Sequence, residues 1–195
     1  MIKTALIVAT GPSLDDKTIQ LCIDSGLSLF GVNKTFEILP LDYFLACNPS
    51  FWNYYWNRGL KDHKAEKWTW DALTAERYGI NYIAGKWAPG LSTDPNYIHY
   101  HHGSGPQVVN IALHKGIKRM LLVGWDMKYT EEKHYFGDYP PELQHNPKTG
   151  PGGEFIGLIK EMETIKPEDY GIEIINCTPG SAMKCFPIMR LEDAL

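Results

Sequence analysis

Long apolar runs and basic blocks are both missing from this sequence. No stretch approaches the roughly 20 apolar residues that a membrane-spanning helix requires. The first residues lead directly into a strand pattern, without the regions of a signal peptide. A net charge of -4 and the absence of a basic block argue against neutralising a run of phosphates. We therefore expect a cytoplasmic protein that binds neither membranes nor nucleic acids.

Cysteine pairs and several ligand-binding motifs are missing as well. The four cysteines form no C-x-x-C pair, which favours reduced thiols. Neither the G-x-G-x-x-G fingerprint of dinucleotide-binding domains nor the G-K-[ST] of a P-loop occurs. No D-x-D motif is present to hold a divalent metal. We predict metal-independent chemistry without a cofactor.

What the sequence does contain is an alternation of strand and helix patterns over 195 residues, a length that suits one domain. Residues 3–9 and 118–123 are continuous apolar runs, typical of strands buried on both faces of a parallel sheet. Further strands are predicted at residues 27–32, 42–46, 66–70, 80–83, 97–102 and 172–176, and helices at 13–26, 51–58, 72–78, 108–115 and 155–165. The alternation predicts a single α/β domain over residues 1–195 with a Rossmann-like, doubly wound, mostly parallel sheet.

Five of the predicted strands end in similar turns, which contain glycine or short polar side chains. In doubly wound sheets, ligands bind beyond the carboxyl ends of the strands. Glycine allows a ligand to approach the backbone, and free amides at a helix start attract phosphate. These turns predict a nucleotide site made of Thr10, Gly11, Ser13, Asn33, Asn48, Ser104, Gly105, Gly124 and Asp126. The alternative for each residue is an ordinary turn-forming role.

Residues 127–153 are rich in polar, aromatic, Pro and Gly residues and show no periodicity, so we interpret them as a short lid segment. Its candidate catalytic residues are Tyr129, His134, Tyr135 and His145, because a histidine can act as general base near neutral pH. The alternative is a surface loop without a role.

Two further clusters have competing interpretations. His99 and His101 would share one face of a strand and could bind a metal, but no carboxylate or cysteine is near them, so we expect packing beside the site. The aromatic run from Phe51 to Trp56 is expected to pack in the core or in a subunit interface rather than to stack on a base or sugar.

The order of these short motifs resembles the bacterial sialyltransferases that extend lipooligosaccharides. The motifs are Gly11-Pro12-Ser13-Leu14, Asn33, Asn48-Pro49-Ser50, Ser104-Gly105, Gly124-x-Asp126 and Cys177-x-Pro179, within residues 3–182. The opening motif also resembles the related 6-hydroxymethylpterin pyrophosphokinase-like family. The sequence departs from the sialyltransferases at Ala9-Thr10, where they have Gly-Asn, and at His101 and Gly103, where they have Arg and Thr.

The resemblance implies a Rossmann-like sheet and a CMP-sialic acid donor. It implies that the nucleotide is bound by Gly11, Ser13, Asn33, Asn48, Ser104, Gly105 and Asp126. It also implies that Tyr129, with His134 or Tyr135, stabilises the departing phosphate, and that His145 is the nearest candidate for the catalytic base.

Three functional hypotheses follow. The first is a sialyltransferase-like glycosyltransferase that uses a nucleotide-activated sugar, most simply a CMP-sugar, and a glycan or other hydroxyl acceptor. The second is an ATP-dependent pyrophosphokinase that acts on a hydroxymethylpterin. The third is a non-catalytic nucleotide-binding module. A homo-oligomer is compatible with all three.

Overall fold

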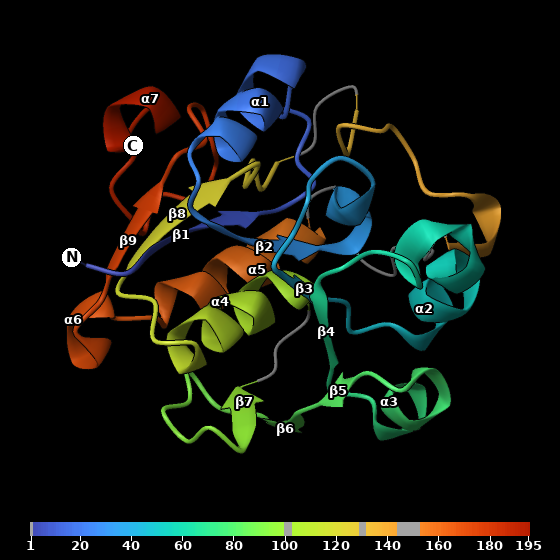
Figure 1. Cartoon of the computed structure of the whole chain (residues 1–195). Coiled ribbons are helices and arrows are strands. Elements are labelled where there is room, and N and C mark those ends of the chain that lie inside the picture. The colour runs from blue at the N-terminus through green and yellow to red at the C-terminus, as the bar shows by residue number, and fades with distance from the viewer. Residues whose placement is uncertain (1, 100–102, 129–131, 144–152) are drawn as a thin grey trace.

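The computed structural model describes residues 2–99, 103–128, 132–143 and 153–195. Its centre is a seven-stranded sheet in the order β5-β4-β3-β2-β1-β8-β9, in which all neighbouring strands are parallel (Figure 1). The strands are β1 (Thr4–Val8), β2 (Ser28–Val32), β3 (Tyr43–Leu45), β4 (Glu66–Thr69), β5 (Asn81–Tyr82), β8 (Arg119–Val123) and β9 (Glu173–Asn176). The predicted α/β class and parallel sheet are confirmed.

The strand order reverses between β1 and β8. From β1 the chain moves outward strand by strand to β5, and it then returns to place β8 on the other side of β1. The pairing of β1 with β8 runs in register from Thr4 opposite Arg119 to Val8 opposite Val123. In doubly wound sheets, ligands bind at such a switch point, beyond the carboxyl ends of the strands.

Helices cover both faces of the sheet because successive strand residues point to opposite sides. Ala5 and Ile7 pack in one core cluster with α4 (Ser104–His114) and α5 (Gly153–Glu163). Leu6 and Val8 pack in a second cluster on the other face. That cluster is completed by α1 (Asp16–Asp24), the 3-10 helix η1 (Asn33–Glu37), α2 (Pro49–Tyr55) and α7 (Leu191–Ala194). Figure 1 shows α1 and α7 above the sheet and α4 and α5 below it.

The remaining elements lie around this frame. They are the π-type turn η2 (Trp56–Leu60), α3 (Ala72–Tyr78), β6 (Ala84–Lys86), β7 (Tyr97–His99), η3 (Pro141–Leu143) and α6 (Pro167–Tyr170). The strands β6 and β7 form a separate two-stranded parallel sheet. The strand predicted at residues 97–102 therefore belongs to this small sheet, as far as it is described, and β6 was not predicted.

The first helix begins later than predicted. Asp15 caps α1, since its side chain accepts a 2.7 Å hydrogen bond from the N–H of Thr18. Pro12 and Ser13 lie in the turn before the helix and do not cap it, so the predicted helix start at Ser13 is wrong.

The aromatic run of α2 packs in the core, as predicted. Phe51, Trp52 and Tyr55 are buried, and the indole N–H of Trp52 donates a 2.9 Å hydrogen bond to the carbonyl of Ala46. The ring of Phe44 lies edge-on to Trp52, at 5.5 Å between centroids. These contacts fix α2 against the end of β3.

The four cysteines are free thiols, and burial raises the pKa of Cys22 to about 12 and that of Cys177 and Cys185 to about 11.

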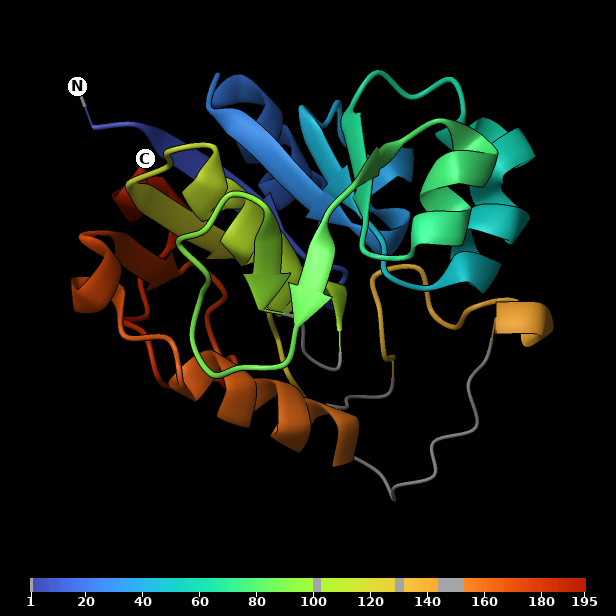
Figure 2. The ribbon, with the colours of Figure 1, turned by 90° about the horizontal axis from the view of Figure 1, so that it is seen from below.

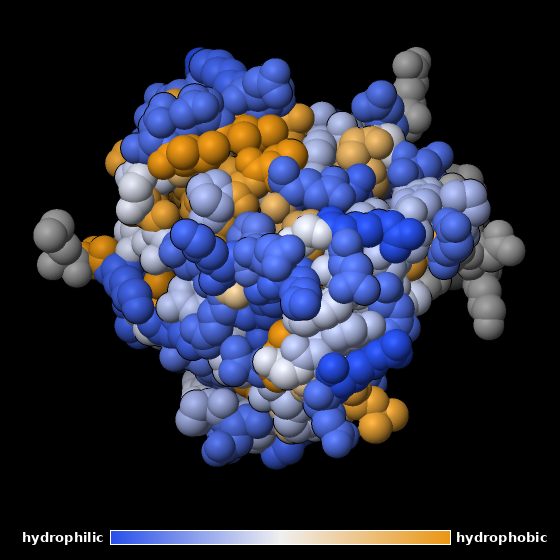
Figure 3. All heavy atoms as spheres, turned by 45° about the vertical axis from the view of Figure 1, so that its right-hand side comes forward, coloured by the Kyte–Doolittle hydropathy of each residue, from blue (hydrophilic) through white to orange (hydrophobic). Residues whose placement is uncertain are grey.

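Within the described ranges, none of the helices combines the length and the apolar character needed to span a bilayer. The face in Figure 3 is mostly hydrophilic, with one apolar band in its upper part.

Candidate functional site

The turns after β1 and β8 are joined at the switch point by hydrogen bonds. The N–H of Gly11 donates to the carbonyl of Gly124 over 2.9 Å. The hydroxyl of Ser13 donates to Oδ2 of Asp126 over 2.7 Å, and the N–H of Ser13 donates to the same oxygen over 3.4 Å. The structure thus brings together four of the predicted site residues. We call this group (Gly11, Ser13, Gly124 and Asp126) the switch-point staple.

Both glycines of the staple are required by close packing. A methyl group at Gly11 would overlap the carboxylate of Asp126 and would lie 2.5 Å from the carbonyl oxygen of Gly124. Gly124 has a φ of +73°, and a methyl group there would lie 2.8 Å from the carbonyl oxygen of Ala9. The absence of side chains serves contact between the two turns, and no ligand is needed to explain it.

The backbone amides of the first turn are already used within the fold. Gly11 donates to Gly124, Ser13 donates to Asp126, and the N–H of Leu14 donates to the carbonyl of Gly11 over 3.2 Å. Pro12 has no N–H to offer. The expectation of free, phosphate-attracting amides at this turn is therefore wrong.

The start of α4 lies at the same edge of the sheet, and unlike the Gly11 turn it is itself the first turn of a helix. The helix begins at Ser104, directly after Gly103, so the first amides of the helix belong to the predicted site residues. The Ser104 hydroxyl accepts a 3.3 Å hydrogen bond from the N–H of Cys47 and lies 3.3 Å from its sulfur. This contact ties α4 to the end of β3.

Gly105 connects α4 to the staple. A methyl group at Gly105 would lie 2.9 Å from the ring of Trp125, whose indole N–H donates to the carbonyl of Ile7 over 2.9 Å. Trp125 stands between the staple residues Gly124 and Asp126 in the sequence, and its side chain is buried. The Gly11 and Ser104 turns, far apart in the sequence, therefore share one edge. The small size of Gly105 is explained by Trp125.

Asn33 and Asn48 follow β2 and β3 and have local roles. Asn33 has a φ of +53°, which asparagine tolerates better than most residues, and begins η1. Oδ1 of Asn48 accepts hydrogen bonds from the N–H of Ser50, over 3.0 Å, and from its hydroxyl, over 2.8 Å. Asn48 thus caps α2, which is the turn-forming alternative considered for it.

Residues 132–143, the longest described stretch of the lid candidate, lie beyond the carboxyl ends of the strands (Figure 2). The N–H of Tyr135 donates to the carbonyl of Thr10 over 3.1 Å, and Thr10 Oγ1 shares a 3.0 Å hydrogen bond with Nδ1 of His134. The hydroxyl of Tyr135 donates to the carbonyl of Lys34 over 2.8 Å. Two predicted catalytic residues therefore contact the strand-end turns. Tyr129, His145, His101 and His102 lie outside the described residues.

Burial sets the protonation of these lid side chains. Loss of water contact lowers the pKa of His134 to about 4, and its hydrogen bond with the Thr10 backbone opposes this only in part. Burial also raises the pKa of Tyr135 and of Tyr139 above their ordinary values. At neutral pH, His134 is neutral and both tyrosines keep their protons as hydrogen-bond donors.

Lys34 is a residue of this edge that the sequence analysis did not identify. Its ammonium lies 4.1 Å from the centre of the Phe136 ring and 3.1 Å from Oε2 of Glu37. Only 16% of its side chain is exposed. The available signal was its position directly after Asn33, at a strand end already assigned to the site.

His99 is the residue of the histidine run that the structure describes. Nδ1 of His99 lies 3.0 Å from the carbonyl of Pro89. In the part of the chain that the structure describes, no three His, Cys, Asp or Glu side chains form a group that could hold a metal ion.

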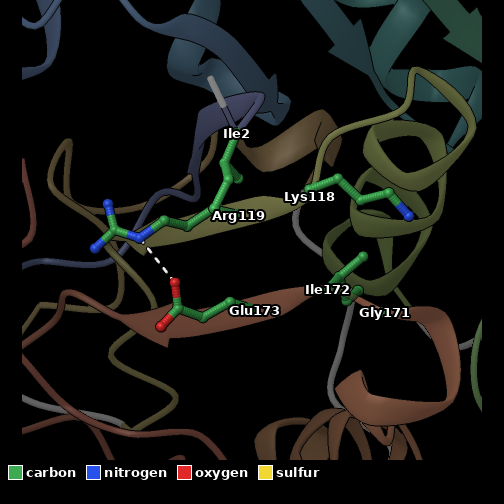
Figure 4. Close-up of a pocket in the computed structure, with 6 residues that line it drawn as sticks. All are labelled: Ile2, Lys118, Arg119, Gly171, Ile172 and Glu173. Atoms are coloured by element: carbon green, nitrogen blue, oxygen red, sulfur yellow. Dashed lines mark hydrogen bonds and ion pairs between the residues drawn. The ribbon is translucent and has the colours of Figure 1, made fainter.

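A cavity of about 450 Å³ lies at the opposite edge of the sheet, near the amino ends of β8 and β9 (Figure 4). Arg119 and Glu173 form a 2.8 Å ion pair across it, and Ile2 and Ile172 contribute apolar surface. This cavity is separate from the predicted nucleotide site, which lies at the carboxyl ends.

No protein-family model matches this chain, and neither a curated protein nor a solved structure matches it.

Proposed function

We propose that this chain binds a nucleotide-activated sugar at the carboxyl edge of its sheet and transfers the sugar to a hydroxyl acceptor. The observation that carries the proposal is the meeting of the Gly11 and Ser104 turns at the switch point, through Gly124, Trp125 and Asp126. The described lid residues lie over the neighbouring turns. A segment that covers the binding edge is what a transferase needs to exclude water from an activated donor.

The donor we propose is a CMP-sugar, and the support for it is the motif order that resembles the bacterial sialyltransferases. In the reaction, the acceptor oxygen forms a bond to the anomeric carbon, and the bond between that carbon and the phosphate oxygen breaks. CMP leaves with the bonding electron pair, and a lid base, for which His145 is the candidate, takes the acceptor proton.

The leaving phosphate requires hydrogen-bond donors at its oxygens. The amides at the start of α4, Ser104 and Gly105, are the proposed backbone donors. Tyr135 is a proposed side-chain donor, whose hydroxyl would turn from the carbonyl of Lys34 to the phosphate when the ligand binds. Tyr129 is the second proposed donor, on the resemblance alone.

The pyrophosphokinase alternative depends on carboxylates that hold Mg²⁺ near the phosphates. Asp126 is the well-placed carboxylate, but its Oδ2 already accepts two hydrogen bonds from Ser13. Oδ1 remains for Mg²⁺, which can bind through a single carboxylate oxygen, so binding of ATP with magnesium is the test of this alternative.

A thermal-shift panel of CMP, CDP, UDP, ADP and ATP, with and without magnesium, tests the proposal. A ligand at about 100 times its Kd adds about 2.7 kcal/mol, which is about 5–10 °C for a chain of this size. We expect CMP to give the largest shift, and we expect CMP release from a CMP-sugar to persist in EDTA. A shift with ATP and magnesium alone would support the pyrophosphokinase instead.

Two variants sharpen the panel. Ser104→Ala should reduce the CMP shift, because it removes the hydroxyl contact with Cys47 that holds the start of α4 against the end of β3. Arg119→Gln changes the cavity at the opposite edge and should leave the shift unchanged. Absence of a shift with every nucleotide would refute the proposal.

A further inference from the structure

Lys34 is a mostly buried cation placed among the strand-end turns. It directly follows Asn33 at the end of β2, and 16% of its side chain is exposed. Its ammonium lies 4.1 Å from the Phe136 ring centre and 5.9 Å from that of Tyr55. Placing an ammonium in such a position costs hydration energy, so its surroundings should provide compensation.

The ion pair with Glu37 is weak compensation. The two residues are separated by one turn of a short 3-10 helix, and 35% of the Glu37 side chain is exposed, so solvent screens the pair. The Phe136 ring face attracts the cation, but this partner belongs to the lid candidate. A more highly charged anion such as a phosphate can therefore displace both partners from the ammonium of Lys34.

The lid residues touch Lys34 at two points. The hydroxyl of Tyr135 donates to its carbonyl over 2.8 Å, and the ring of the next residue, Phe136, faces its ammonium. The lid is also bound to Thr10 through the N–H of Tyr135. An anion bound to Lys34 would thus lie between the strand-end turns and the lid.

A phosphate bound at the carboxyl edge of the sheet needs a positive group on the β2 side. The amides of Gly11, Ser13 and Leu14 are used within the fold, so the first turn offers little to a phosphate. The start of α4 can serve one side of a phosphate, while Lys34 lies on the β2 side. A charged hydrogen bond from an ammonium to a phosphate oxygen is stronger than a neutral one.

We propose that Lys34 binds the phosphate of the nucleotide, exchanging Glu37 for a phosphate oxygen when the ligand enters. This assignment rests on the proposed function and adds to it. The ligand class is a nucleoside phosphate, and the free nucleoside gains nothing from Lys34.

Calorimetric titration with CMP and with cytidine tests this assignment on the full chain. Lys34→Met keeps the apolar length of the side chain against Phe136 and removes the charge. We expect it to weaken CMP binding about 10-fold to 100-fold and to leave cytidine binding unchanged. Lys34→Arg should retain most of the CMP affinity. Lys133→Met removes a charge from the lid, from a side chain that is 51% exposed, and should change CMP binding less than about 3-fold.

The possible failures are distinct. Equal CMP affinity in wild type and Lys34→Met overturns the role of Lys34 and leaves the proposed function intact. An equal loss of CMP and cytidine binding in Lys34→Met also overturns it, because the residue would then act on the fold or on the nucleoside. If the wild type binds no CMP, the proposed function itself fails. Thermal unfolding of each variant verifies that it is folded.

Discussion

Replacement of Gly11 by alanine should destabilise the protein, because the added methyl group would overlap the carboxylate of Asp126. The carboxylate has little room to move, since Asp126 is 6% exposed and is held by the hydroxyl of Ser13 over 2.7 Å. The carbonyl oxygen of Gly124, 2.5 Å from the added carbon, blocks a second direction. Gly11 is not among the glycines with positive φ, so the cost arises from overlap and not from backbone strain.

The expected magnitude is that of overpacking. Extra carbon in a close-packed site costs about 1–3 kcal/mol, and each kcal/mol lowers the melting temperature of a domain of this size by about 2–4 °C. Gly11→Ala should therefore lower the melting temperature by about 2–12 °C. Gly157 is a matched control, because it lies in α5 with no heavy atom within 4 Å of an added methyl group. Gly157→Ala should stabilise the protein by about 0.5–1 kcal/mol.

Urea unfolding of the single variants and of Gly11→Ala/Asp126→Ala isolates the contact. Asp126→Ala alone loses the hydrogen bonds from Ser13, but it also removes the overlapping group. The double variant should thus lose less stability than the sum of the single variants, by at least about 0.5 kcal/mol. A fully additive double variant, or a Gly11→Ala variant as stable as the wild type, would refute the overlap.

Two further predictions concern the lid and the support of β7. The pKa of His134 is lowered to about 4 from an ordinary value near 6.5, so as the pH falls the unfolded chain binds this proton first. The stability that His134 contributes should be complete above about pH 6.5 and should decline by up to about 1.4 kcal/mol per pH unit between about pH 6.5 and 4. His134→Asn should remove this decline in urea titrations across the range, and equal pH slopes for variant and wild type would contradict the prediction. Asn110 is fully buried, and its Oδ1 accepts hydrogen bonds from the N–H of Ser92 over 2.8 Å and from the N–H of His99 over 3.0 Å. Asn110→Leu should lower the free energy of unfolding in urea by about 2–5 kcal/mol, while the exposed control Asn96→Ala should change it by less than about 0.5 kcal/mol. A loss below about 1 kcal/mol for Asn110→Leu would show that these hydrogen bonds are replaceable.

The main sheet could be predicted because its strands carry their own signal. The apolar runs that became β1 and β8 are continuous, as expected for strands buried on both faces. β6 could not be predicted, since it has three residues with a glycine at its centre, and its pairing with β7 is a tertiary feature. The start of α1 was misplaced for a similar reason: a serine after a strand is a common helix cap, but the side chain of Ser13 bonds to Asp126, 113 residues away.

The candidate site was predictable at the level of topology and not at the level of individual roles. Carboxyl ends of parallel strands meet at one edge, so polar turns after those strands must gather there. Which partner each side chain takes depends on packing across the edge. The ring of Trp125 beneath Gly105 and the ammonium of Lys34 beneath Phe136 are such cases, and no local pattern encodes them.

The two halves of this edge differ in how firmly they are held, and the difference bears on ligand entry. In the β1–β8 half, the staple surrounds the buried Asp126, and opening the staple would leave the Asp126 carboxylate without its hydrogen bonds from Ser13. In the half next to η1, the lid is held to Thr10 and Lys34 by the three hydrogen bonds from Tyr135 and His134 described above. At about 0.5–1.5 kcal/mol each, these bonds total about 2–5 kcal/mol, and the buried Leu143 and the packing of Tyr135 and Tyr139 against the same core cluster add apolar contacts. Entry of a nucleotide therefore has to break the contacts of residues 132–143, whereas the staple can stay intact.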